Sequence, residues 1–314
     1  MKPYKVAMLA ISLAVLMGVV YFSNPFVIAD KFANSNYEYI AAAFALSLFA
    51  LMLGTLKWHT LLKKLKLREL FPVQMLGYTI SNFTPAKAGE PAKAVLLKMR
   101  SNIPVSHSLP SIIWERVLDV IVLLVFSMVA VSTVSVSSNF FLPSVVSIMI
   151  FASVVVVSLS VLYSEKFGRR LFSLLRKLPV LRRLQGDFMD LFYKSQIEKT
   201  RIAKSFVLTF VTWFTIGCVL YLSLMAFGVA QNPLVLTGIV ALSVVIGIAS
   251  SLPGGIGTTE IVMIFLLGVV GVDAGVAAAA TITFRLATIW MTNILGGVSF
   301  VYLSRKFNVK NLLK

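Results

Sequence analysis

The sequence predicts an all-α polytopic membrane protein with about six full transmembrane helices and two broken, re-entrant helical hairpins. Three observations support this class. Hydrophobic residues make up 58% of the 314 residues and mean hydropathy is +0.91. Only 13% of the residues are charged, whereas soluble domains have about 25%. Long apolar runs recur along the chain, so we treat residues 1–314 as a single integral membrane domain.

The predicted spans are apolar runs close to the length that a helix needs to cross a bilayer, about 20 residues. They are 6–22, 39–56, 109–136, 143–163, 205–229 and 276–303. The first run follows Lys2 and Lys5 and could be a signal peptide. We interpret it as a retained helix, because it is long for a signal sequence and further spans follow.

The distribution of basic residues predicts the orientation. Of the 29 Lys and Arg residues, 26 lie in the N-terminus and in segments 57–70, 87–100, 164–204 and 304–314. Cytoplasmic loops retain Lys and Arg, which places these segments and both termini on the cytoplasmic side of the cell membrane. The basic, amphipathic part of 164–204 is expected to lie on anionic lipid at the inner interface. The net charge of +17 therefore indicates a membrane surface, and we expect no nucleic-acid partner.

Two apolar segments are interrupted by turn residues. Residues 234–252 and 256–271 flank a break rich in Pro and Gly, and residues 71–83 and 92–100 flank another. We interpret the former as a hairpin that enters from outside and the latter as one that enters from the cytoplasm, although two full spans at 234–271 satisfy the charge pattern equally well. In each break a Pro precedes a Gly by four residues, and an Arg follows the Pro by 31 or 32 residues. These matches suggest an inverted repeat with halves 1–136 and 143–303, with chance similarity as the alternative.

Helix breaks inside a bilayer are typical of binding sites, because the freed backbone groups must face protein or a wet cavity. The positive start of a returning half-helix attracts anions, with Thr258 and Thr259 as natural caps. Arginines and acids inside spans add to this prediction, since each is costly unless paired or hydrated. The alternatives are that the breaks only kink packed helices, that Glu115 and Arg116 lie at the interface, and that Arg285 simply pairs with Glu260. The predicted substrate-binding residues are Asn82, Lys87, Gly89, Glu90, Glu115, Arg116, Asp119, Gly254, Gly255, Gly257, Thr258, Glu260 and Arg285.

The sequence offers few residues for metal binding or catalysis. Cys218 is the single cysteine, and His59 and His107 lie in separate polar connections without a second ligand one turn away. We therefore expect no metal, no cofactor and no catalytic residue. The carboxylates of the predicted site are available for proton coupling.

Four segments carry a family resemblance. SNFTPAKAGEPAKAVLL (81–97), WERVLDV (114–120), SLPGGIGTTE (251–260) and FRLATIW (284–290) resemble the lysylphosphatidylglycerol synthase transmembrane region family, also called flippase-like domain proteins. The resemblance implies a polytopic membrane protein whose best-understood relatives flip aminoacylated phospholipids. In the synthases a soluble aminoacyltransferase domain follows the membrane part; here 11 residues follow Leu303. We therefore expect no lysylphosphatidylglycerol synthesis by this chain alone.

The leading hypothesis is a lipid flippase that moves an anionic phospholipid or a polyprenyl-phosphate-linked lipid across the cytoplasmic membrane. Two alternatives remain open: an accessory protein or enzyme of lipid-linked glycan synthesis, and a secondary transporter of small anions or amino acids. Anionic membrane lipids are the expected partners, and a homo-oligomer is compatible with the sequence. The transported substrate, the direction and the energy source are not specified by the sequence.

Overall fold

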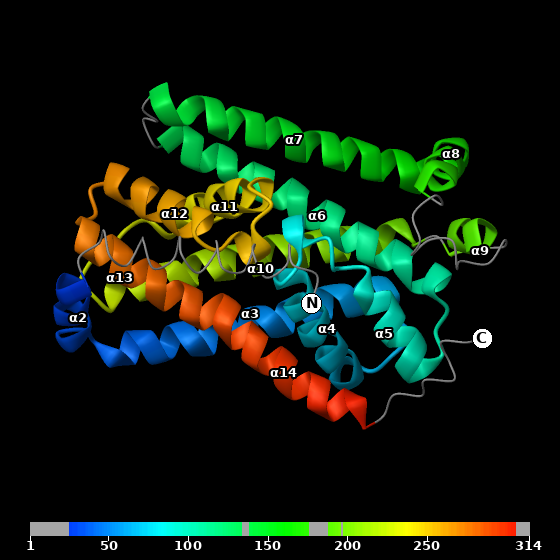
Figure 1. The fold of residues 1–314 in the computed structure, drawn as a ribbon, viewed down its shortest axis with the longest axis horizontal. Helices are drawn as coiled ribbons and strands as arrows, with labels where there is room; N and C mark the ends of the chain where they lie inside the picture. The colour runs from blue at the N-terminus through cyan, green and yellow to red at the C-terminus, as the bar shows by residue number, and fades with distance from the viewer. Residues whose placement is uncertain (1–24, 134–137, 176–187, 196, 306–314) are drawn as a thin grey trace, which may run out of the picture.

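The computed structural model describes residues 25–133, 138–175, 188–195 and 197–305, and every regular element within them is helical (Figure 1). The predicted first span, 6–22, lies outside these residues. So does the middle of the predicted basic segment, 176–187. The all-α prediction is confirmed for the described part of the chain.

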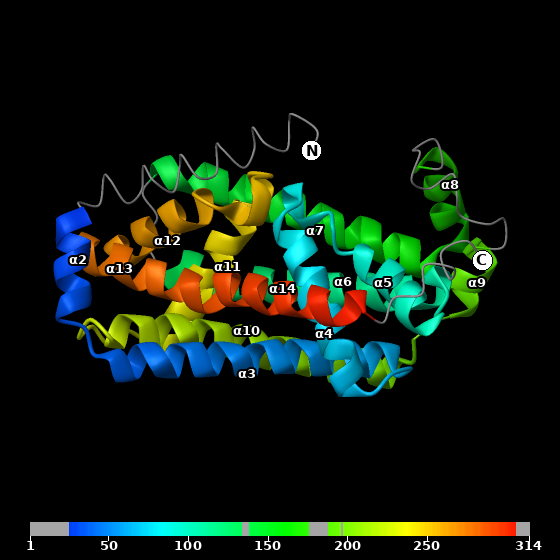
Figure 2. The same cartoon turned by 60° about the horizontal axis from the view of Figure 1, so that its bottom comes forward.

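The longest helices run along the long axis of the molecule. Helices α3 (Tyr37–Leu62) and α10 (Lys199–Met225) lie side by side and antiparallel in both views (Figures 1 and 2). Helix α6 (Val105–Thr133) packs on α7 (Ser138–Tyr163). Helix α13 (Ala274–Arg285) continues through a π-helical turn, Leu286–Trp290, into α14 (Met291–Ser304). The short α2 (Pro25–Ala33) packs against α13 at one end.

Three helical stretches are long and apolar enough to cross a membrane: Tyr37–Leu62, Lys199–Met225 and Ala274–Ser304. A fourth candidate is Ile148–Tyr163 taken together with Glu165–Leu174, which is bent by 111°. These stretches contain or overlap the predicted spans 39–56, 205–229, 276–303 and 143–163. The predicted span 109–136 coincides with most of α6, a helix of 29 residues that carries charged side chains.

Two helix pairs are interrupted at their tips. Helices α4 (Leu67–Asn82) and α5 (Ala92–Ser101) flank residues 83–91, the first break. Helices α11 (Pro233–Ala249) and α12 (Thr258–Val269) flank residues 250–257, the second break. The pairs approach from opposite ends of the molecule, and the two breaks contact each other near its centre (Figures 1 and 2). The chain order and opposed directions agree with the predicted inverted repeat.

The two breaks share a backbone conformation. Each contains a 3₁₀ turn that starts at a proline, Pro85–Lys87 and Pro253–Gly255. The two residues after each proline have positive φ: Ala86 at 49° and Lys87 at 56° in the first break, Gly254 and Gly255 both at 64° in the second. Glycine adopts this region freely, whereas other L-residues lose roughly 1–2 kcal/mol there. The similarity of the breaks therefore extends beyond proline and glycine spacing.

The basic connecting segments gather at one end. Helices α8 (Glu165–Leu175) and α9 (Phe188–Lys194) lie there, and Arg169 of α8 pairs with Glu165 and with Asp190 of α9. The Arg169 guanidinium lowers the pKa of the Asp190 carboxyl through their hydrogen bond. Helix α10 begins inside the predicted basic segment 164–204, so the last basic residues of that segment form the first turns of a long helix.

Polar and apolar side chains are distributed as expected for a protein solvated by lipid. Large apolar side chains are exposed along α7 and α14, including Met149, Val156, Ile294 and Val298. Conversely, many charged and hydroxyl side chains are buried. An apolar core of α10, α11, α12 and α13 holds the second hairpin in place.

Candidate functional site

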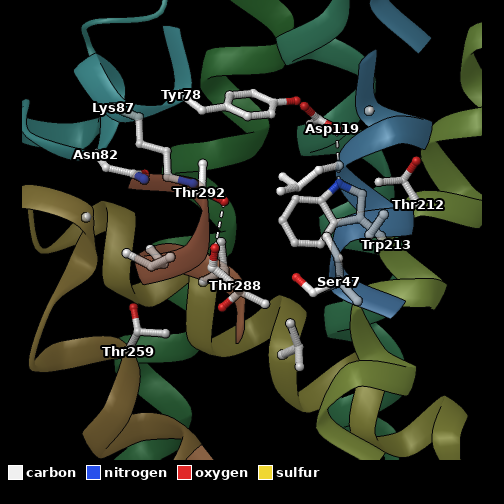
Figure 3. A pocket seen from close by; sticks show the side chains of 18 of the residues that line it. Ser47, Tyr78, Asn82, Lys87, Asp119, Thr212, Trp213, Thr259, Thr288 and Thr292 are labelled. Carbon is white, nitrogen blue, oxygen red and sulfur yellow. Dashed lines mark hydrogen bonds between the residues drawn. The ribbon is translucent and has the colours of Figure 1, made fainter. Parts of the chain in front are cut away.

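A cavity of about 160 Å³ lies where the two breaks meet. Its walls come from α3, α4, the first break, α6, α10, α11, the second break, α12 and the α13–α14 helix. In Figure 3, Lys87 and Asn82 reach in from one side and the Trp213 ring faces them across the cavity. The volume is sufficient for roughly ten water molecules, so it can hold a polar headgroup.

A buried lysine of α5 anchors the first hairpin to α6. The Lys93 Nζ atom lies 2.6 Å from Glu115 Oε2 and 2.9 Å from Glu90 Oε2, and its side chain has no exposed surface. It also lies over the rings of Trp58 and Tyr78, 4.7 and 5.2 Å from the ring centroids. This ammonium is therefore fully enclosed by carboxylates and aromatic faces.

A second buried lysine lies near the end of α3. The Lys57 Nζ atom is 2.6 Å from Asp119 Oδ1 and 3.8 Å from Glu115 Oε1. The Trp213 Nε1 group donates to the same Asp119 oxygen over 3.0 Å. The placement of Lys57 and Lys93 in cytoplasmic segments is wrong, because both are interior residues.

Arg116 connects these carboxylates to the cavity. Its guanidinium lies 2.6 Å from Asp119 Oδ2 and 3.3 Å from both Glu115 Oε1 and Glu90 Oε1. The side chain is 30% exposed and lines the cavity. Three cations and three carboxylates thus neutralise one another in this cluster.

A separate ion pair holds the second break. Arg285 Nε donates to Glu260 Oε1 over 2.6 Å, and Arg285 Nη2 donates to the Gly254 carbonyl over 3.2 Å. The other Glu260 oxygen accepts from the Gly257 backbone N–H over 2.7 Å. The start of α12, predicted to be free for an anion, is therefore already occupied by the Glu260 carboxylate. Thr258 is the first residue of α12 and Gly257 is its N-cap, so the predicted threonine caps are wrong.

The ion pairs repeat across the two halves. In each half, the glutamate at or just after the break pairs with the arginine of the next helix: Glu90 with Arg116, and Glu260 with Arg285. The alternative interpretation, in which Arg285 pairs with Glu260, therefore agrees with the structure. Both arginines are engaged by the protein's own carboxylates.

Lys87 differs from these cations. It lines the cavity from the first break, and among the described residues no carboxylate lies within ion-pairing distance of its ammonium group. Around the cavity, five basic side chains face four carboxylates, which leaves one net positive charge. This charge is located at the Lys87 ammonium.

The predicted residues separate into three groups. The lining residues are Asn82, Lys87, Glu90, Arg116, Asp119, Gly254 and Arg285. Glu115 and Glu260 lie behind them as ion-pair partners. Gly89, Gly255 and Gly257 belong to the breaks, and Thr258 is the first residue of α12. A Cβ on Gly89 would lie 2.9 Å from the Ile80 carbonyl oxygen, and one on Gly254 3.3 Å from that of Asn82. The glycines thus serve the backbone turn and its close packing.

Sequence reasoning missed the uncharged wall of the cavity. It includes Ser47, Tyr78, Thr212, Trp213, Thr288 and Thr292, together with apolar residues. Single hydroxyls and aromatics inside apolar helices are too common to be informative. Lys57 could have been found, because it lies only one residue beyond an 18-residue apolar run.

Within the described residues, no group of three His, Cys, Asp or Glu side chains could hold a metal ion.

The fold and the site define an integral membrane protein with two opposed broken helix pairs around a charged interior. The chain belongs to the lysylphosphatidylglycerol synthase transmembrane region family, whose model matches residues 8–296. It is similar to a UPF0104 membrane protein of Methanothermobacter thermautotrophicus, with 25% identity over 99% of this chain and 98% of the relative. Similar proteins with the same description occur in Pyrococcus horikoshii, at 24% identity over 88% and 90%, and in Methanocaldococcus jannaschii, at 22% over 96% of each chain.

Proposed function

We propose that the protein translocates an anionic lipid across the cell membrane. The headgroup crosses through the cavity between the breaks, while the acyl chains stay in the bilayer. The observation that carries this proposal is Lys87, whose ammonium is without a carboxylate partner among the described residues in a cavity whose other lining charges are paired. A partly buried charge without a partner is stabilised by a counter-ion, and a lipid phosphate supplies one.

The distribution of basic residues along the chain supports a membrane placement for this proposal. Both helix pairs are re-entrant, the end with α8 and α9 faces the cytoplasm, and both termini lie on that side. Anionic lipids then contact the basic end of the molecule and supply the substrate. The proposed activity is transport and involves no covalent step.

A reconstitution experiment tests this function. Vesicles containing the purified protein should equilibrate a tail-labelled phosphatidylglycerol between leaflets faster than empty vesicles. Lys87→Ala should slow this movement at least about tenfold, because a charge-assisted hydrogen bond to the phosphate is lost. Lys87→Arg should retain most of the rate, and Lys64→Ala, which removes an exposed lysine remote from the cavity, should leave it unchanged.

Two results would contradict the proposal. One is the absence of acceleration for every lipid in a panel of anionic phospholipids and polyprenyl phosphates. The other is uptake of water-soluble glycerol phosphate without movement of any lipid, which would assign the cavity to a small-anion transporter.

A further inference from the structure

Four hydroxyl groups of the cavity wall share one hydrogen-bonding state. Those of Ser47, Thr212, Thr288 and Thr292 lie 2.6–2.7 Å from the backbone carbonyls of Ala287, Leu208, Phe284 and Thr288, respectively. A carbonyl oxygen can only accept, so each hydroxyl must donate its single hydrogen there. The hydroxyl oxygens therefore present only lone pairs to the cavity (Figure 3).

The aromatic side chains that line the cavity have their polar hydrogens engaged as well. Tyr78 O–H donates to Glu115 Oε1 over 3.2 Å, and Trp213 N–H donates to Asp119. These two residues therefore offer a ligand the Tyr78 phenol oxygen, which can accept a hydrogen bond, and the apolar face of the Trp213 indole ring. The cavity thus has the Lys87 ammonium as a donor on one side and the acceptor hydroxyls of Ser47 and Thr212 beside Trp213 on the other (Figure 3).

A phosphate group matches only the donor side, because its oxygens are acceptors. The acceptor side requires a ligand with hydrogen-bond donors. Hydroxyl groups meet this requirement, and the C–H face of a sugar or polyol packs on an indole ring. An ammonium group also donates, but Asp119 and Glu90 are already paired with Lys57, Arg116 and Lys93, and Lys87 adds a like charge.

We infer that the substrate is a lipid with a monoanionic phosphodiester joined to an uncharged, hydroxyl-rich group such as glycerol, inositol or a sugar. The phosphate lies at Lys87, and the hydroxyl-rich part lies against Trp213, Thr288 and Thr292. This inference rests on the proposed function and narrows it to one class of headgroup.

The test compares two lipids of equal charge in the same vesicles. Phosphatidylglycerol carries free hydroxyls, whereas phosphatidylethanol is a monoanionic phosphodiester without them. Wild-type protein should move tail-labelled phosphatidylglycerol about tenfold faster than phosphatidylethanol, which is the effect of one or two hydrogen bonds. The double variant Thr288→Val/Thr292→Val should remove this preference by slowing phosphatidylglycerol alone.

A matched control checks that the double variant acts through the cavity. Thr283→Val removes a buried hydroxyl of the same helix that also bonds to a carbonyl, that of Ala279, but does not line the cavity. It should leave the preference intact. Melting temperatures of all variants in detergent show whether the proteins remain folded.

The outcomes separate the two proposals. Equal rates for both lipids, with both slowed by Lys87→Ala, would overturn the headgroup inference and leave lipid transport standing. Faster movement of phosphatidylethanolamine or lysylphosphatidylglycerol than of phosphatidylglycerol would assign the acceptor side to an ammonium group instead. If no lipid moved faster than in empty vesicles, the proposed function itself would be refuted.

Discussion

The buried ionic side chains are the most unusual residues of this chain. Lys93 and Glu115 have no exposed side-chain surface, and Lys57 has only 2%. Removing charges from water costs several kcal/mol per ion, and attraction offsets this cost only when pairing is complete. Here each carboxylate of the cluster has at least two cationic neighbours. The cluster therefore fixes the first hairpin against α3 and α6, and its loss would leave unpaired buried charge.

The smaller ion pair of the second break permits a clean double-mutant cycle. Arg285→Met should lower the free energy of unfolding in detergent by about 3–5 kcal/mol, because it leaves the Glu260 charge buried beside one backbone donor. Glu260→Gln should also destabilise the protein but keep an acceptor for Gly257. The double variant should be more stable than the sum of the single effects implies. Additivity within about 0.5 kcal/mol would show that the pair does not couple.

Sequence reasoning identified Arg116 and Arg285 but assigned Lys57 and Lys93 to cytoplasmic segments. The positive-inside rule uses position along the chain. It does not reveal that α3 continues through Lys57 to Leu62, or that α5 turns Lys93 inward. Such pairing depends on tertiary contacts between α3, α5 and α6, which no local pattern specifies.

At the scale of elements, the breaks were the best-predicted feature. Proline and glycine indicated both interruptions, and the structure places the tips together. The positive φ angles of Ala86 and Lys87 carry no such signal, because neither residue is a glycine. The turn around them is held by side chains: Thr84 Oγ1 accepts from the Gly89 N–H, and Ser81 donates to the Lys87 carbonyl. The first break thus keeps a strained backbone that presents Lys87 to the cavity.

Re-entrant and fully spanning hairpins differ in the accessibility of the second break. In a Cys218→Ser background, a cysteine at Lys64 should react with an impermeant maleimide from the cytoplasm, and one at Ala274 from outside. A cysteine at Ser251 should react far more slowly than either, because the proposed re-entrant placement puts the break at mid-depth. Reaction of the Ser251 cysteine from the cytoplasm as fast as that of the Lys64 cysteine would contradict the re-entrant placement.

The whole molecule combines an apolar exterior with a polar centre. Exposed residues of α7 and α14 match lipid tails, while the ion clusters and hydroxyls surround the cavity. Composition alone predicted the membrane class. The pairing of charges and the acceptor wall could not be predicted, because they arise only when helices and breaks far apart in the sequence meet. The central claim is that this cavity receives a lipid headgroup.

Photo-crosslinking tests that claim most directly. A diazirine amino acid at Ile289 reports from the cavity wall, and one at Ile294 reports from the exposed face of the same helix. In membranes labelled with radioactive phosphate, both positions should yield phospholipid adducts on illumination. Lys87→Ala should abolish the adduct at Ile289 and spare the one at Ile294. An Ile289 adduct that lacks phosphate, or that persists unchanged in Lys87→Ala, would contradict the account.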